Sequence, residues 1–117
     1  MKRIKKINHL GKEIIYTDYS GLNEVKLIET ILDLEKTIFE ENKPFLHILN
    51  LSNTLLTMKV LLAINRHARL TKHLLLKSAV IGITGINNTI IEGISTIFGR
   101  EIKPFNNLED AKNWIVV

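Results

Sequence analysis

The sequence contains no cysteine, which excludes disulfide bonds, zinc–thiolate sites and thiolate nucleophiles. It also lacks any run of the roughly 18 apolar residues that a membrane-spanning helix needs. The first six residues are rich in lysine and arginine, but polar residues follow them at once, so the apolar core of a signal peptide is missing. These absences predict a cytoplasmic protein with no membrane span.

Acidic residues are missing from the middle of the chain, because no Asp or Glu occurs from Asn42 to Ile91. Many of the acids lie earlier, between Glu24 and Glu41, and the net charge is +4. The basic residues of the acid-free segment are Lys43, Lys59, Arg66, Arg69, Lys72 and Lys77. This asymmetry has two interpretations: the two halves attract each other or are solvated, or the basic middle binds an anionic partner.

The length of 117 residues and the apolar content of 45 % are those of one globular domain, with no repeat and no Pro/Gly/Ser-rich linker. We therefore treat residues 1–117 as a single domain. Such a chain is long enough to bury a core without disulfides or structural metals.

Hydrophobic patterning predicts two strands at the start, Arg3 to His9 and Glu13 to Tyr19, joined by a short hairpin that contains Gly11. A helix follows, with Asn23 as its N-cap and an end near Asn42, because Pro44 prevents its continuation. Apolar residues in this helix recur at helical spacing: Leu27, Ile31, Leu34 and Ile38.

The rest of the chain alternates between strands and helices. Two nearly apolar segments, Phe45 to Leu51 and Ser78 to Ile83, are typical of strands that are covered on both faces. Thr57 is expected to cap a helix that runs to about Arg69, and residues 70–77 are expected to form an extra turn. A helix that opens at Asn87 or Asn88 and stops at Gly99, a strand at 101–105, and a helix capped by Asn106 with Glu109 complete the pattern.

The predicted fold is α/β, with a mixed, mostly parallel sheet of about five strands in the order ββαβαβαβα. The first strand is expected to run antiparallel to the second, and the later strands to be joined by right-handed crossovers. Pro104 cannot donate a hydrogen bond to a neighbouring strand, so the last strand is expected at an edge of the sheet.

Three segments resemble the STAS domain of anti-sigma-factor antagonists and anion-transporter tails, and still more the small bacterial STAS-like proteins grouped with CRAL-TRIO-type domains. They are Gly11 to Leu22, Lys77 to Gly85 and Ile102 to Ile115, and the last has the ending Glu-x-Ala-x-x-Trp at residues 109–114. The resemblance implies a non-catalytic regulatory module, controlled in that family by phosphorylation of a Ser after the third strand.

The corresponding junction here runs from Leu49 to Met58, and Thr57 falls near the phosphoacceptor position of the family. The Asp-Ser-Ser-Gly signature of that position is absent from this chain, and the connection is a few residues shorter. The loop still leaves the carboxyl end of a buried strand and enters a helix, where an anion or phosphoryl group is favoured. It is the first candidate site, as a switch or binding loop, with the residues Asn50, Ser52, Asn53, Thr54 and Thr57. The alternative is that these residues only close turns and cap a helix.

A second strand-to-helix turn, at Gly85, Asn87 and Asn88, could bind an anion, although it has neither the P-loop ending nor a dinucleotide fingerprint. Gly82, just before it, is more typical of close packing. Ser20 has no base near it in the predicted fold, because His9 lies at the other end of its strand. The four histidines do not have metal-ligand spacing, and His47 is expected to be a hydrogen-bonded core residue.

We therefore expect a protein-interaction or regulatory module with no enzymatic activity, no metal and no cofactor. The alternative is a carrier for a small molecule, either a lipid or an anionic metabolite, bound between the sheet and a helix. A protein partner is expected. Nucleic acid is disfavoured because no aromatic residues interleave with the basic ones. Edge strands and exposed apolar helix faces are compatible with a homodimer.

Overall fold

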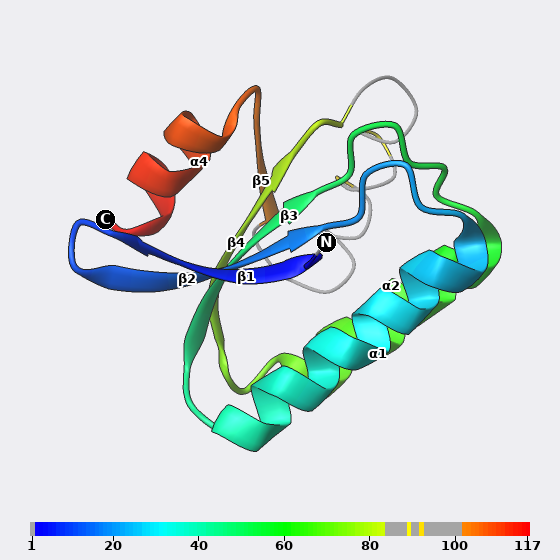
Figure 1. The fold of residues 1–117 in the computed structure, drawn as a ribbon, viewed down its shortest axis with the longest axis horizontal. Coiled ribbons are helices and arrows are strands. Elements are labelled where there is room, and N and C mark those ends of the chain that lie inside the picture. The colour runs from blue at the N-terminus through cyan, green and yellow to red at the C-terminus, as the bar shows by residue number, and fades with distance from the viewer. Residues whose placement is uncertain (1, 84–88, 90–91, 93–101) are drawn as a thin grey trace.

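A computed structural model describes residues 2–83, 89, 92 and 102–117 of the chain. Its strands and helices form an α/β fold around one five-stranded mixed sheet (Figure 1). In chain order they are β1 (Ile4–His9), β2 (Lys12–Asp18), α1 (Glu24–Glu41), β3 (Phe45–Asn50), α2 (Met58–Thr71), β4 (Leu75–Ile81), β5 (Ile102–Phe105) and α4 (Leu108–Ile115). The predicted helix that opens at Asn87 or Asn88 lies outside the described residues.

The strands are ordered β1-β2-β3-β4-β5 across the sheet. β1 pairs antiparallel with β2, and every other pair is parallel. β5 lies at an edge, which confirms the placement derived from Pro104. The carboxyl ends of β2, β3 and β4 therefore meet at one end of the sheet, and the loop after β3 emerges between the other two.

Helices α1 and α2 lie side by side on one face of the sheet, and α4 covers the other (Figure 1). Each of the first two connects parallel neighbouring strands, so the two helices run in the same direction. On their face, Leu27 and Ile31 pack with Leu49, Val60 and other apolar residues. On the opposite face, α4 packs with a separate apolar cluster that includes Ile14, Ile48, Ala79, Ala111 and Ile115.

The first helix begins and ends where the sequence predicts. The Asn23 side chain accepts a hydrogen bond from the Lys26 N–H at 2.9 Å. Asn42 ends the helix in the left-handed conformation, with φ 48°, and its N–H donates to the Ile38 carbonyl. Asparagine tolerates this conformation better than most residues, so local chemistry alone fixes both ends of α1.

The prediction for residues 70–77 is wrong, because α2 continues to Thr71 and β4 already begins at Leu75. The pairing with β3 shifts between Phe45 and Leu46, so Leu76 is an additional, exposed residue in β4. This irregularity breaks the alternation by which a strand is recognised. At its other end β4 stops at Ile81, because Gly82 has φ +79° and leaves the extended conformation.

The last helix begins one residue later than predicted. Asn107, and not Asn106, caps it, by accepting a hydrogen bond from the Asp110 N–H at 2.9 Å. Neighbouring asparagines with acids three residues later offer the same local chemistry twice, so the sequence did not distinguish the two positions.

Candidate functional site

The loop from Leu51 to Thr57 connects β3 to α2 and is held by backbone hydrogen bonds on both sides. The Leu51 N–H donates to the Ile81 carbonyl at 2.9 Å, which ties the loop to β4. The Gly21 N–H donates to the Asn53 carbonyl at 3.2 Å, which ties it to the loop after β2. The candidate site is therefore a fixed part of the carboxyl end of the sheet.

Asn50 uses both ends of its side-chain amide within the protein. Its Oδ1 accepts a hydrogen bond from the Ser52 N–H at 2.9 Å, and its Nδ2 donates to the Tyr16 hydroxyl at 3.0 Å. The first bond closes a turn directly after the strand, as Asn commonly does. This geometry agrees with the turn-closing interpretation of Asn50.

Ser52 packs against the backbone of Gly82. A Cβ at Gly82 would lie 2.0 Å from Ser52 Oγ and 2.6 Å from Ser52 N, so only glycine fits there. The positive φ of Gly82 adds a second reason for glycine. The expected role of Gly82 in close packing is confirmed, and its contact is the candidate loop itself.

Thr54 faces inward and Asn53 faces outward. The Thr54 hydroxyl is buried and lies within hydrogen-bond distance of the carbonyl oxygens of Ser52, at 3.0 Å, and of Tyr19, at 3.2 Å. Asn53 is exposed and has φ 50°, the left-handed conformation that Asn tolerates. Within the loop, Thr54 is therefore a structural link to the loop after β2.

Thr57 caps α2, as predicted, and also joins the two helices. Its Oγ1 accepts a hydrogen bond from the Val60 N–H at 3.3 Å and donates to Glu24 Oε2 at 2.5 Å. Glu24 is the first residue of α1, and its carboxylate lies at the N-terminus of α2, where negative charge is favoured. The place where an anion was expected is thus held by a carboxylate of the chain itself.

Two large apolar residues of this region point outward, and the sequence reasoning did not select them. Leu55 in the loop is 75 % exposed, and Met58 in the first turn of α2 is 70 % exposed. Their neighbours Leu56 and Val60 are buried and fix the orientation of the segment. Apolar character alone does not separate Leu55 and Met58 from these buried neighbours, so the sequence offers no signal for their exposure.

The second predicted site, at Gly85, Asn87 and Asn88, lies outside the described residues. The basic segment is better described. Arg66 Nη1 lies 2.9 Å from Glu35 Oε1, so one basic residue of α2 pairs with an acid of α1. For this pair, the interpretation that the acidic and basic segments attract each other holds.

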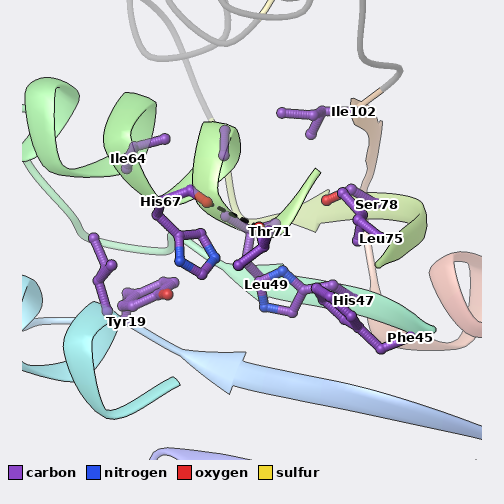
Figure 2. A pocket seen from close by; sticks show the side chains of 12 residues that line it. Tyr19, Phe45, His47, Leu49, Ile64, His67, Thr71, Leu75, Ser78 and Ile102 are labelled. Atoms are coloured by element: carbon purple, nitrogen blue, oxygen red, sulfur yellow. Dashed lines mark hydrogen bonds between the residues drawn. The ribbon is translucent and has the colours of Figure 1, made fainter. Parts of the chain in front are cut away.

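A cavity of about 60 Å³ lies between the sheet and the helices α1 and α2 (Figure 2). It is lined by His47 from β3, His67 and Thr71 from α2, Ser78 from β4, and mostly apolar neighbours. Thr17 Oγ1 lies 3.0 Å from His47 Nε2, so His47 is the hydrogen-bonded core residue that was predicted. Pockets for small organic ligands usually measure about 300–1,000 Å³, so this cavity holds only a few atoms.

Tyr19 lines the same cavity and is almost completely buried. Burial raises the pKa of its hydroxyl well above the ordinary value, and the nearby Glu35 carboxylate acts in the same direction. Tyr19 is therefore protonated over the physiological range, and it contributes a neutral polar group to the cavity wall.

Residues 2–83, 89, 92 and 102–117 contain no group of three His, Asp or Glu side chains that could hold a metal ion. Within the same residues, no helix has both the length and the apolar character that crossing a bilayer requires.

No model of a known protein family matches the sequence, and no curated protein sequence matches it.

Proposed function

We propose that this chain is a non-catalytic protein-interaction or regulatory module of the STAS-like type. Its contact surface is the loop between β3 and α2 together with the first turn of α2. The observation that supports this best is that two large apolar side chains of this segment are exposed while two of its hydroxyl groups are used inside the protein. Thr54 and Thr57 use their hydroxyls in internal hydrogen bonds, whereas Leu55 and Met58 are exposed.

A rigid backbone that presents apolar side chains is well suited to binding a protein. Apolar side chains supply most of the favourable free energy in the centre of an interface. A loop that is already ordered loses little conformational entropy on binding. The backbone bonds to Ile81 and Gly21 supply that order here. The STAS-like assignment rests on the resemblance in sequence and on the compatible element order.

The proposal is tested by affinity capture with the full chain from a lysate of the organism that makes it. Leu55→Glu and Met58→Glu place a charge in the proposed surface, and we expect both to lose proteins that the unchanged chain retains. Leu10→Glu is the matched control, because Leu10 is also exposed but lies in the β1–β2 hairpin at the other end of the sheet. Identical capture by all four chains would overturn the proposed surface.

Phosphorylation at Ser52 or Thr57 is a separate part of this proposal. A phosphoryl group on Thr57 would meet the Glu24 carboxylate and push the first turns of α1 and α2 apart. Thr57→Asp imitates this charge and keeps an oxygen that can cap α2. We expect it to change capture while the thermal unfolding of the domain remains cooperative. Unchanged capture would remove phosphorylation at Thr57 from the proposal and leave the apolar surface.

The carrier alternative has in its favour the mostly apolar cavity between the sheet and the helices α1 and α2. Its volume of about 60 Å³ is much smaller than a lipid or a metabolite requires. Native mass spectrometry of protein purified from its own source separates the two functions. A retained small molecule would favour the carrier, and a mass equal to that of the chain would favour the interaction module.

A further inference from the structure

The outer surface of the helix pair carries a seam of exposed apolar residues that the loop surface does not include. Val25, Leu32 and Phe39 follow one another at intervals of seven along α1, so they lie on one side of it. Leu62 and Leu70 are exposed on α2. Their exposed fractions range from 39 % to 62 %, in helices whose opposite sides pack on the sheet. Several large exposed apolar side chains on one side of a helix pair indicate an interface.

Hydrogen bonds between the helices bring the residues of the seam to matching levels. Glu24 bonds Thr57 at the first turns, and Glu35 pairs with Arg66 farther along. Leu32 precedes Glu35 by three residues, and Leu62 precedes Arg66 by four. Phe39 and Leu70 each follow the pair by four residues. Leu32 is therefore at about the same position as Leu62 along the two parallel helices, and Phe39 at about the same position as Leu70.

The two helices have opposite charge. Residues Glu24–Glu41 of α1 include six acids and two lysines, a net charge of −4. Residues Met58–Thr71 of α2 include Lys59, Arg66, Arg69 and no acid, a net charge of +3. A surface with one negative helix, one positive helix and an apolar seam is complementary to itself.

We propose that this surface binds a second copy of the chain, about a two-fold axis parallel to the helices. This axis places α1 of each copy over α2 of the other, so opposite charges meet at both contacts. Rotation about this axis does not change the position of a residue along the helix direction. Leu32 of one copy therefore faces Leu62 of the other, and Phe39 faces Leu70. A two-fold axis perpendicular to the helices would place α1 on α1 and α2 on α2, where like charges repel. Charge complementarity therefore selects the first arrangement.

The area of the helix-pair surface determines how tightly we expect the two copies to bind. A helix of 14 residues is about 21 Å long, and two adjacent helices are about 20 Å wide, so the flat area is about 400 Å² per copy. Stable interfaces bury about 800 Å² per partner. We expect a weak dimer that forms with increasing concentration and weakens at high salt.

Sedimentation velocity of the full chain over a range of concentrations tests the assembly. We expect the unchanged chain to shift from monomer to dimer, and Leu62→Glu to raise the dissociation constant at least tenfold. Leu76→Glu is the control, because Leu76 is equally exposed but lies in β4, away from the seam. Circular dichroism verifies that both variants are folded. A chain that stays monomeric throughout, or a Leu62→Glu variant that dimerises normally, would overturn the proposal.

The absence of cysteine allows a direct test of the symmetry. Leu32→Cys and Leu62→Cys are each introduced into separate chains and oxidised alone or mixed. We expect the mixture to form crosslinked dimers, because these positions face each other across the proposed axis. Equally strong crosslinking by Leu32→Cys alone would overturn the arrangement. The loop residues Leu55 and Met58 are unchanged in these chains, so this result is independent of the capture experiment.

Discussion

The two faces of the sheet are built differently. Under α4, every buried residue of the core cluster is apolar, from Ile14 and Ile48 to Ala111 and Ile115. Among the described residues, the buried polar side chains belong to the face covered by α1 and α2 or to the loop above it. They are Thr17, Thr30, Glu35, His47, Thr54, Thr71 and Ser78.

The two faces therefore have different roles: the apolar face mainly stabilises the fold, and the face with buried polar groups positions the proposed interaction surfaces. A dry apolar face gains free energy from burial alone and needs no partners for its side chains. A face with buried polar groups requires satisfied hydrogen bonds, and these bonds fix positions: Thr17 with His47, Glu35 with Arg66, and Thr57 with Glu24. The polar face therefore orients α1, α2 and the loop, which together carry both proposed interaction surfaces.

The largest loss of stability is expected from a substitution on the apolar face that α4 covers. Ile48→Ala removes a completely buried side chain, and we expect the free energy of unfolding to fall by about 3–4 kcal/mol, because a cavity is added to the lost burial. Urea denaturation measures this change. Leu10→Ala, in the exposed hairpin, should change the same quantity by less than about 0.5 kcal/mol. A loss below about 1 kcal/mol for Ile48→Ala would contradict the assignment of this face to stability.

On the polar face, Arg66→Ala should cost about 1–2 kcal/mol, because it leaves the buried Glu35 carboxylate without its ion-pair partner. The side chain of Arg66 is 57 % exposed and that of Glu35 only 7 %, so the cost arises mainly from the acid. The double variant Arg66→Ala/Glu35→Gln should therefore recover part of the loss in urea denaturation. No recovery would mean that Arg66 acts through packing of its stem and not through Glu35.

The sequence predicts the parts of this fold that depend on local chemistry. Asn23 and Thr57 were assigned as helix starts because each is a capping residue before an apolar helical pattern, and the end near Asn42 was assigned from Pro44. The start of β4 was missed because the irregular pairing at Leu76 is decided by β3, about 30 residues away. The choice of Asn107 over Asn106 was missed because the two positions look alike locally.

The candidate loop shows the same limit. Sequence position identified the loop after β3, since parallel strands place their carboxyl ends together. The sequence could not reveal that the Thr57 hydroxyl donates a hydrogen bond to the Glu24 carboxylate, because these residues are 33 positions apart. Nor could it show that Gly82 is packed against Ser52, or that the outward residues are Leu55 and Met58. Of the predicted polar residues, Thr54 is buried and Asn53 is exposed, and the large apolar side chains of Leu55 and Met58 are exposed beside them.

A smaller loss of stability is expected from removing the buried hydrogen bond between Thr17 and His47. Thr17→Val removes the hydroxyl that lies 3.0 Å from His47 Nε2 and keeps nearly the same shape. We expect a loss of about 1 kcal/mol, the usual contribution of one hydrogen bond. Thermal unfolding measures it, with Thr37→Val on the exposed side of α1 as the matched control. Equal effects of the two changes would mean that the buried hydrogen bond contributes no more to stability than the exposed one.

The last prediction concerns how steeply the stability changes with pH in alkaline solution, and it depends on Tyr19. Burial raises the pKa of Tyr19 in the folded state above its ordinary value of 10.0, so the unfolded chain loses this proton first. Above that pH the unfolded state binds fewer protons than the folded state, and the stability of the fold must decrease as pH rises. The stabilisation from the protonated Tyr19 hydroxyl is fully present below the unfolded pKa. Above that pKa it is lost at a rate of at most about 1.4 kcal/mol per pH unit.

Tyr19→Phe has no such proton, so the difference in stability between the two chains should be constant up to about pH 9 and should shift in favour of the variant near pH 11. Lysines titrate in both chains and cancel in this difference, which urea denaturation at each pH measures. A constant difference across the whole range would mean that the Tyr19 hydroxyl reaches solvent in the folded protein, and that the polar face is open where the structure has it closed.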